Sequence, residues 1–380
     1  MWRSIEIRNF RSLEHVKATL APFTVVVGPN SSGKSNFVDA FAFARDIATD
    51  ASHAIQNRGG IASIRRWSPT RSLDITIDVR IGVRKDFANI YAGHVFTLAS
   101  KKDGIWSFKR EEIRICRNKE SIVLRQRPGT GRMHAGLELD ETVSAMLTTP
   151  QWTPGSHVPT LPDLRSVHRF RLEPEGMRRP QVATERTRLD ESGSNLAIAV
   201  QSLRAQPAKW AIVLDAMRKI IPSLTRIEDA VVGRYMSLRF FQARPAGNEA
   251  EFTATEMSEG AIRALGILVA AQQMQPRELL ILEEPEVAIH PGAAGVLFDA
   301  LKAASRHSNV LITTHSPELL DAASDEEILV CDYRKGVTEV GPLDKRQRKL
   351  VRDGLFSISE IMRAEPLRID GKRPPLVGED

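Results

Sequence analysis

A glycine-rich segment near the N-terminus has the residue types of a phosphate-binding loop. Residues 28–35 satisfy the pattern G-x-x-x-x-G-K-[ST] and end in Lys34 and Ser35. In such a loop the backbone N–H groups turn toward a phosphate, the lysine reaches the β and γ phosphates, and the hydroxyl coordinates Mg²⁺. The residues expected to bind the nucleotide are Gly28, Pro29, Asn30, Ser31, Ser32, Gly33, Lys34, Ser35 and Asn36. The alternative, a glycine-rich turn without function, is disfavoured because the motif follows a predicted strand and precedes a predicted helix.

Two carboxylates follow a short apolar run in the C-terminal half of the chain. Residues 279–282 predict a buried strand, and Glu283 and Glu284 come directly after it. A phosphate-binding loop needs an acidic partner at the carboxyl edge of a neighbouring strand. We therefore expect Glu283 to hold Mg²⁺ through water, with Ser35 as the other metal ligand. Glu284 is expected to orient or deprotonate the attacking water.

A third apolar run places a histidine at the same edge of the predicted sheet. Residues 310–313 predict another buried strand, which is followed by Thr314 and His315. His315 is then expected where a γ-phosphate would lie. A purely structural histidine is the alternative, but the position after a third core strand favours function. The expected catalytic residues are Glu284, His315 and Lys34.

The elements that must position these residues lie at the two ends of the chain. Residues 1–50 predict strand, turn, strand, loop and helix, and helices and strands alternate again after residue 256. Between them, alternating segments at 74–83, 94–98, 105–108 and 113–116 predict an antiparallel β lobe from about residue 51. Residues 190–222 predict helices. The predicted fold class is α/β, with both chain ends building one mostly parallel core sheet and the middle inserted.

Composition narrows the function classes. The 380 residues are 42% apolar and 26% charged, which suits one large or two medium globular domains. The net charge of +6 tolerates an anionic partner such as DNA without demanding one. The two cysteines, Cys116 and Cys331, exclude a disulfide scaffold and a cysteine zinc cluster. With no signal peptide and no long apolar run, we expect a cytoplasmic protein without a membrane partner.

Together these motifs resemble the ABC-type ATPase heads of the SMC/RecF class. The segments that carry the resemblance are 9–12, 28–35, 257–260, 283–286, 290–291 and 313–317. The likeness is nearest to stand-alone AAA ATPases related to the OLD family, and it runs from about residue 3 to 345, with weak motifs in the middle. It implies a P-loop NTPase that hydrolyses ATP to ADP and phosphate, with ATP and Mg²⁺ as cofactors.

The resemblance also implies a homodimer that sandwiches ATP. Heads of this class bind ATP between two subunits placed head to tail, so that Ser258 and Gly260 of one chain complete the γ-phosphate site of Lys34 in the other. The helix that starts there would aim its positive dipole end at the phosphate. An ordinary helix cap is the alternative for these residues. The class further places Arg11 near the nucleotide and His315 as the γ-phosphate switch.

The residue patterns and the resemblance together predict five regions in the chain. They are an N-terminal part of the ATPase core with the P-loop (1–50), an antiparallel β lobe (51–189), a helical lobe with return strands (190–255), a C-terminal part of the core with the signature, the acidic strand and the switch histidine (256–345), and a C-terminal helix and tail (346–380). Two features depart from the class. Glu283 stands where most heads have aspartate, and the lobe-connecting glutamine stays open among Gln126, Gln181 and Gln201.

The motifs leave two functional classes open, an ATPase and a nucleotide-locked scaffold or sensor. OLD nucleases carry a further metal-binding domain that does not fit after His315, so cleavage would come from a separate nuclease or effector. We expect an ATPase that acts with such a partner in anti-phage defence or DNA maintenance. The alternative is a nucleotide-locked scaffold or sensor with little hydrolysis that holds a partner protein. Glu284 beside Glu283 favours turnover.

Two basic stretches could contact DNA. The first encloses Trp106 and Phe108, and the second spans residues 165–188. Acidic residues dilute the first stretch, and solvated strand faces have the same composition, so DNA stays an open partner. The basic residues are Lys101, Lys102, Lys109, Arg110, Arg114, Arg117, Lys119, Arg125, Arg127 and Arg132 in the first stretch, and Arg165, Arg169, Arg171, Arg178, Arg179, Arg186 and Arg188 in the second.

Overall fold

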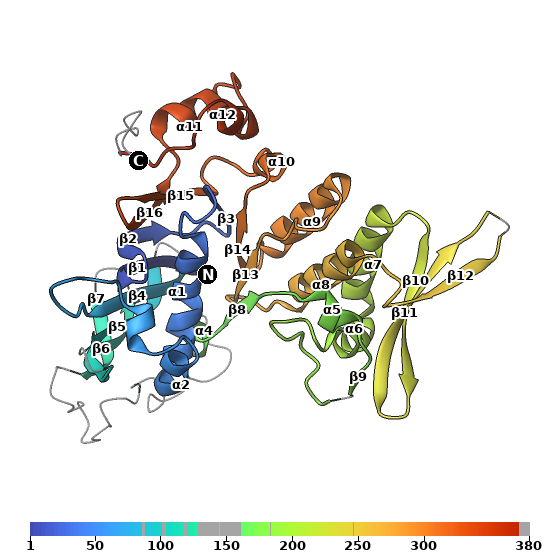
Figure 1. Cartoon of the computed structure of the whole chain (residues 1–380), viewed down its shortest axis with the longest axis horizontal. Coiled ribbons are helices and arrows are strands. Elements are labelled where there is room, and N and C mark those ends of the chain that lie inside the picture. The colour runs from blue at the N-terminus through green and yellow to red at the C-terminus, as the bar shows by residue number, and fades with distance from the viewer. Residues whose placement is uncertain are drawn as a thin grey trace. The chain divides into compact units, whose positions relative to one another are not determined.

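The chain divides into two compact units in the computed structural model (Figure 1). The structure describes residues 1–85, 88–100, 104–117, 120–127, 144, 161–182, 184–245 and 247–371. Unit 1 comprises Met1–Val167, Arg277–Leu279 and Ser324–Asp380, and unit 2 comprises His168–Pro276 and Leu280–Ala323. Each unit is described by itself below.

Unit 1 opens with three strands. They are β1 (Trp2–Phe10), β2 (Leu13–Thr19) and β3 (Phe23–Val27). β1 and β2 pair antiparallel, with Ile7 opposite Val16. All five residues of β3 are buried, as its continuous apolar run predicts. The sequence analysis missed β2, because polar residues fill its exposed positions and only Leu13, Val16 and Ala18 are buried.

The C-terminal hairpin of unit 1 joins the N-terminal strands. β15 (Ile328–Arg334) and β16 (Val337–Pro342) pair antiparallel with each other. β15 runs parallel to β3, and β16 runs parallel to β2 through Thr338 and Leu13. The prediction that the two ends of the chain share one sheet is therefore confirmed for these strands.

Four antiparallel strands extend the same sheet on the other side of β1. They are β4 (Ile75–Lys85), β5 (Ala88–Ser100), β6 (Trp106–Arg117) and β7 (Glu120–Arg127). β4 pairs with β1, so the order in unit 1 is β7-β6-β5-β4-β1-β2-β16-β15-β3. The segments 105–108 and 113–116, predicted as separate strands, form one strand with a register shift between Ile113 and Arg114 against β7.

Helices complete unit 1. α1 (Lys34–Ile47) contacts β1 and β4 and buries Phe37, Phe41 and Phe43 (Figure 1). The chain then forms helices where the β lobe was expected to begin. The remaining helices of the unit are α2 (Ala51–Gln56), α3 (Ile61–Ile64), α4 (Leu161–Leu164), α11 (Lys345–Arg352) and α12 (Ile358–Ala364).

Unit 2 combines a helical cluster with a small antiparallel sheet. The helices are α5 (Pro174–Arg178), α6 (Leu196–Arg204), α7 (Pro207–Ile220) and α8 (Glu259–Gln273). The strands β10 (Leu224–Val232), β11 (Tyr235–Ala243) and β12 (Glu249–Thr253) pair in that order, and β9 (Gln181–Val182) pairs with β11. α8 is buried on nearly every side and contacts α5, α6 and α7, so it forms the centre of the cluster.

A second group of elements in unit 2 carries the acidic motif. β13 (Leu279–Glu283) lies between β14 (Asn309–Thr314) and β8 (Val167–Phe170) in the strand order. α9 (Pro291–Ala304) connects β13 to β14, and α10 (Pro317–Leu320) follows β14. β14 is buried throughout, and β13 is buried up to Glu283.

The architecture confirms the α/β fold class, with core strands joined by helices and an antiparallel part. The residue boundaries of the five predicted regions stay a prediction. Among the residues that the structure describes, no helix is both long enough and apolar enough to cross a membrane.

Candidate nucleotide-binding site

The glycine-rich loop joins β3 to α1 and is closely packed. Gly33 caps α1 in a left-handed conformation, with φ of 97°. A Cβ atom on Gly33 would collide with the Thr338 side chain, and one on Gly28 would collide with the carbonyl oxygen of Cys331. Both glycines are therefore required by the close approach of β15 and β16, and Gly33 is also required by its positive φ. Pro29, by contrast, is exposed to solvent.

Lys34 is folded back into this loop. Only 6% of the residue is exposed, and Nζ donates hydrogen bonds to the carbonyl oxygens of Gly28 at 3.0 Å and Pro29 at 2.9 Å. A positive charge is thus held inside the curve of the loop. Ser35, the next residue, is exposed, so its hydroxyl is accessible to a ligand. This arrangement suits the binding of a polyphosphate.

A buried hydroxyl in the loop gives a further indication of a ligand. Ser32 is 2% exposed, and its Oγ has no hydrogen-bond partner among the residues that the structure describes. The Ser32 carbonyl oxygen, in contrast, accepts hydrogen bonds from Thr338 Oγ1 at 3.0 Å and Cys331 Sγ at 3.3 Å. Burial raises the pKa of the Cys331 thiol to about 11, which keeps it protonated as a donor. An orphaned buried hydroxyl is unfavourable, and it fits a loop that binds a polar ligand.

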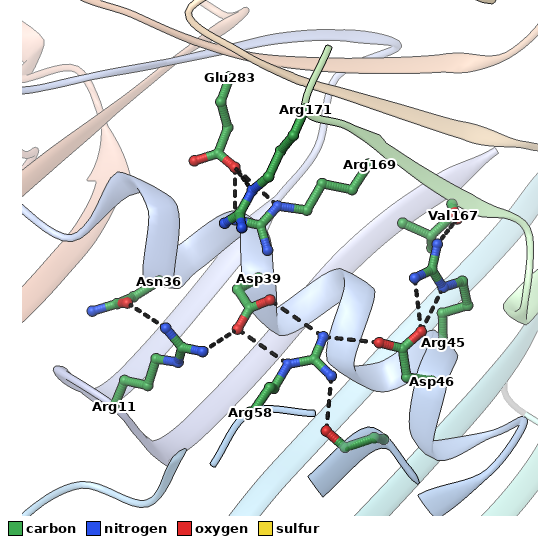
Figure 2. Close-up of polar contacts among 11 residues, drawn as sticks. Arg11, Asn36, Asp39, Arg45, Asp46, Arg58, Val167, Arg169, Arg171 and Glu283 are labelled. Atoms are coloured by element: carbon green, nitrogen blue, oxygen red, sulfur yellow. Dashed lines mark hydrogen bonds and ion pairs between the residues drawn. The ribbon is translucent and has the colours of Figure 1, made fainter. Parts of the chain in front are cut away.

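Arg11 lies beside the first turn of α1 (Figure 2). Its guanidinium lies 2.9 Å from the Asp39 carboxylate and 3.5 Å from Oδ1 of Asn36. Asn36 in turn donates to Ser12 Oγ at 2.7 Å. Asp39 is nearly buried and also contacts Arg58 at 3.3 Å. The structure therefore brings Arg11 next to Asn36, in the same unit as the loop, and fixes it through Asp39.

Glu284 and His315 meet in unit 2. Glu284 follows β13 in a left-handed conformation, with φ of 47°, and its N–H donates to the Thr313 carbonyl oxygen at 2.9 Å. This turn brings Oε1 of Glu284 to 3.0 Å from Nε2 of His315. The two side chains are 41% and 30% exposed, so the pair can be reached by water. The expectation that the two strand ends bring these residues together agrees with this geometry.

Glu286 fixes the histidine loop, a role that the sequence analysis missed. Its Oε1 accepts hydrogen bonds from Thr314 Oγ1 at 2.5 Å and from the His315 backbone N–H at 3.3 Å. The Thr314 hydroxyl also accepts from the Ser316 N–H at 2.9 Å. The sequence signal for this role was Glu286 itself, a third carboxylate in residues 283–286 with no basic residue next to it in the sequence.

Glu283 is engaged by two arginines. Arg169 Nε and Nη2 lie 2.9 and 2.6 Å from its Oε1, and Arg171 Nε lies 3.4 Å from the same oxygen (Figure 2). Arg169 is 7% exposed. These arginines were grouped in sequence with a DNA-contacting stretch, and for Arg169 that assignment is wrong. A nearly buried guanidinium paired with a carboxylate has no surface to offer a phosphate backbone.

The candidate signature segment begins α8. Ser258 is the N-cap residue, and its Oγ accepts from the Ala261 N–H at 3.2 Å. A Cβ atom on Gly260 would collide with the carbonyl oxygen of Ala288, so the glycine lets the loop after β13 approach the helix start. Ser258 is exposed. The capping role is thus present, and the residue is also accessible to a ligand or a second chain.

Arg178 supports this segment from α5. Its Nη2 donates to the Met257 carbonyl oxygen at 2.6 Å, while its neighbour Arg179 is 70% exposed and pairs with Glu175 at 3.2 Å. Arg178 is therefore part of the fold next to the signature, whereas Arg179 lies on the surface.

We expect Arg178→Ala to weaken ATP-driven dimerisation by about tenfold, because a hydrogen bond from a charged group to the signature turn is lost. The measurement is the dimer fraction against protein concentration in saturating ATP, in a background that does not hydrolyse it. Arg179→Ala is the matched control and should shift the midpoint by less than about twofold. Equal shifts for the two variants would contradict the role given to Arg178.

Two of the three glutamine candidates have internal roles. Gln181 is buried, and its Oε1 accepts from the Ala197 N–H at 2.8 Å, so it supports the start of α6. Gln201 donates to Asp229 at 3.0 Å, and the side chain of Gln126 lies outside the described ones. Asn195 clamps the preceding loop through the Arg186 and Arg188 carbonyl oxygens. None of these contacts marks a lobe-connecting glutamine.

Part of the first basic stretch is also ion-paired within the chain. Lys109 lies 2.8 Å from Asp74, and Arg110 pairs with Glu112. Hydrogen bonding to Asp74 raises the pKa of Lys109. Lys101, Lys102, Lys119 and Arg132 lie outside the described residues, as do the side chains of Arg114, Arg117, Arg125 and Arg127. DNA binding stays a prediction.

Ser35 and Glu283 fit a Mg²⁺ ion that is also bound by phosphate oxygens, but not a Mg²⁺ ion held by protein ligands alone. The part of the chain that the structure describes holds no group of three or more His, Cys, Asp or Glu residues able to bind a metal ion. Mg²⁺ commonly takes one or two protein ligands and completes its shell with phosphate oxygens and water. Ser35 and Glu283 remain the predicted protein ligands, and the phosphates would have to supply the rest.

Comparisons with known proteins agree with this class of site. Residues 1–123 match the family model "AAA ATPase domain", and residues 163–321 match "AAA domain, putative AbiEii toxin, Type IV TA system". No curated protein matches the chain by sequence.

Solved SMC heads share the fold. One similar structure is an Smc head bound to the C-winged helix domain of ScpA, at 15% identity and a TM-score of 0.57, covering 92% of this chain and 99% of that one. Another is an Smc head domain with an extended coiled coil, bound to the C-terminal domain of ScpA derived from Pyrococcus furiosus, at 13% identity and a TM-score of 0.52, covering 93% and 99%.

The chain has the fold of solved SMC heads, and the two family models that match parts of it describe AAA domains, one of them an AAA ATPase domain. The predicted resemblance is confirmed at this level. The narrower likeness to the OLD family stays a prediction.

Proposed function

We propose that this chain binds ATP at residues 28–35 and hydrolyses it to ADP and phosphate. The observation that carries the proposal is the contact of 3.0 Å between Glu284 Oε1 and His315 Nε2 at the ends of two core strands. A carboxylate paired with a histidine, both accessible to water, is suited to take a proton from a nucleophilic water. The compact loop around Lys34 supplies the phosphate-binding half of the proposal.

Each residue of the proposed site then has a defined role. Lys34 would exchange its carbonyl partners for phosphate oxygens, which are stronger hydrogen-bond acceptors. Glu284 would accept the proton of the attacking water, and His315 would hold Glu284 in position and contact the γ-phosphate. Bound Mg²⁺ would neutralise charge on the β and γ phosphates, with Ser35 and Glu283 as its protein ligands.

Dimerisation around ATP is the second part of the proposal. Ser258 and Gly260 of a second copy would meet the γ-phosphate, with the start of α8 adding its dipole. The exposure of Ser258 and the support of its turn by Arg178 favour this role. A head-to-tail pair of this kind has two equivalent composite sites.

The proposed setting is anti-phage defence or DNA maintenance with a separate nuclease or effector. The family model matched by residues 163–321 names a putative toxin of a toxin–antitoxin system, and the similar Smc heads are bound to another protein, ScpA. Both observations support an ATPase that works on or with a partner. We propose a cytoplasmic location, and DNA remains a candidate ligand.

A nucleotide-locked scaffold or sensor is the second candidate function. The pairing of Glu283 with Arg169 favours the scaffold. A carboxylate that is already paired with a guanidinium binds a metal ion less readily, and ATP hydrolysis would then be slow. In that case ATP binding would assemble a complex, and hydrolysis would be incidental.

Steady-state phosphate release by the purified chain, with and without duplex DNA, separates the two candidates. Glu284→Gln serves as the blank. The proposal expects Mg²⁺-dependent turnover that disappears in the blank, and a rise with DNA would indicate a DNA-responsive ATPase. ATP binding without turnover under both conditions would favour the scaffold.

A further inference from the structure

The two arginines on Glu283 differ in burial although they reach the same oxygen. Arg169 has 8% of its side chain exposed and contacts Oε1 through both Nε and Nη2, at 2.9 and 2.6 Å. Arg171 has 66% exposed and contacts Oε1 only through Nε, at 3.4 Å. Figure 2 shows both guanidinium groups converging on the carboxylate. The strong, fixed contact is therefore the one from Arg169.

This arrangement affects how the carboxylate can meet a cation. The two guanidinium groups and the Glu283 carboxylate carry one net positive charge between them, so these three side chains by themselves repel a bare divalent cation. A metal ion that approached Oε1 would also have to displace the arginine donors that this oxygen already accepts. The complex of Mg²⁺ with a nucleoside triphosphate, however, carries net negative charge, and the same group attracts it.

We infer that Arg169 is a positioning residue for Glu283. With Arg169 in place, the Glu283 carboxylate binds the metal ion when the ion arrives in complex with a nucleoside triphosphate, and not as the free ion. The inference rests on the proposed function, since it concerns the metal ligand of the same site. Arg169 holds the carboxylate in place and suppresses binding of the free ion, so that metal and nucleotide enter together. Arg171, which is exposed and more distant, contributes less to this effect.

Binding of Mn²⁺ without nucleotide, followed by electron paramagnetic resonance of the free ion, tests the inference directly. Wild-type protein is expected to bind Mn²⁺ weakly. Arg169→Gln should bind it about tenfold more tightly, because the carboxylate is released from its guanidinium partner. Arg169→Lys keeps the charge but not the two-nitrogen contact and should lie between the two. Arg171→Gln is the matched control and should change the affinity less than Arg169→Gln does.

A double variant separates a positioning role from a merely structural one. In Arg169→Gln combined with Glu283→Gln, the gain in Mn²⁺ affinity should disappear, because the released carboxylate is gone. A gain that persists in the double variant, or equal Mn²⁺ affinity in wild type and Arg169→Gln, would overturn the inference. If Arg169→Gln does not fold, Arg169→Lys carries the comparison, and wild-type affinity in that variant overturns the inference.

Binding of a fluorescent ATP analogue, with Mg²⁺ and with chelator, is measured on the same wild-type preparation. Wild type that binds no nucleotide contradicts the proposed function, whatever the Mn²⁺ result. Wild type that binds the analogue, together with Mn²⁺ affinities unchanged by Arg169→Gln, contradicts only the inference about Arg169.

Discussion

Lys34→Ala is expected to abolish ATP binding, with a loss of about 100-fold or more in affinity. The Lys34 ammonium lies inside the glycine-rich loop, where it contacts two backbone carbonyl oxygens at 2.9 and 3.0 Å. In the nucleotide complex its partners would be phosphate oxygens, which form shorter and stronger charge-assisted hydrogen bonds. Alanine removes the charge and every donor at once. Fluorescence anisotropy of a labelled ATP analogue measures the affinity.

The control for this variant must separate a binding defect from a folding defect. Lys17→Ala, on an exposed position of β2, removes one lysine without touching the loop and should bind ATP as wild type does. The melting temperature of Lys34→Ala without nucleotide should lie near that of wild type. Wild-type affinity in Lys34→Ala would refute the assignment of residues 28–35 as the nucleotide site.

Glu284→Gln is expected to bind ATP as wild type does but to lose hydrolysis by a factor of about 10² to 10⁴. The amide has the shape of the carboxylate and still reaches His315, but it cannot accept a proton from water. ATP should therefore remain intact and hold the two heads together. Light scattering in saturating ATP and Mg²⁺ should report a dimer for this variant, and a phosphate assay should report no turnover.

An exposed glutamate provides the comparison. Glu251, on β12, pairs with Arg239 at the surface, and Glu251→Gln should hydrolyse ATP at the wild-type rate. A Glu284→Gln protein that stays monomeric in saturating ATP would contradict the sandwich. One that hydrolyses ATP normally would contradict the role of Glu284 as base.

Much of the candidate site could be predicted because its parts follow short apolar strands. β3, β13 and β14 each read as a continuous apolar run bounded by polar residues, so the positions of Lys34, Glu284 and His315 after strand ends followed from local sequence. The glycine pattern likewise indicated a tight loop, and the structure shows what each glycine avoids.

Contacts between distant segments could not be predicted in the same way. Arg169 and Glu283 are separated by 114 positions, and nothing in either neighbourhood pairs them. A buried network in unit 1 was missed for the same reason. His94 and Ser144 both contact the Glu111 carboxylate, at 2.9 and 2.6 Å, although these residues come from separate segments. Local spacing gives the type of each element, whereas tertiary packing decides which charges meet.

The division of β6 into two predicted strands has a local cause. Charged residues at 109–112 interrupt the apolar alternation and suggested a break. In the structure Glu111 and Glu112 are buried within the strand, where His94 and Ser144 contact Glu111 and Arg110 pairs with Glu112. Buried, paired carboxylates therefore concealed one continuous strand.

The head-to-tail ATP sandwich is tested most directly by mixing two variants that are each inactive. Lys34→Ala has a nucleotide loop that cannot bind ATP but an intact signature segment at residues 257–260. Ser258→Arg has an intact nucleotide loop but a blocked signature segment. Phosphate release is measured for wild type, for each variant alone and for their equimolar mixture. We predict turnover by wild type, none by either variant, and recovery in the mixture to at most about a quarter of the wild-type rate, since half of the dimers would be mixed and each would hold one intact site. A mixture as silent as its components, beside an active wild type, would contradict the sandwich.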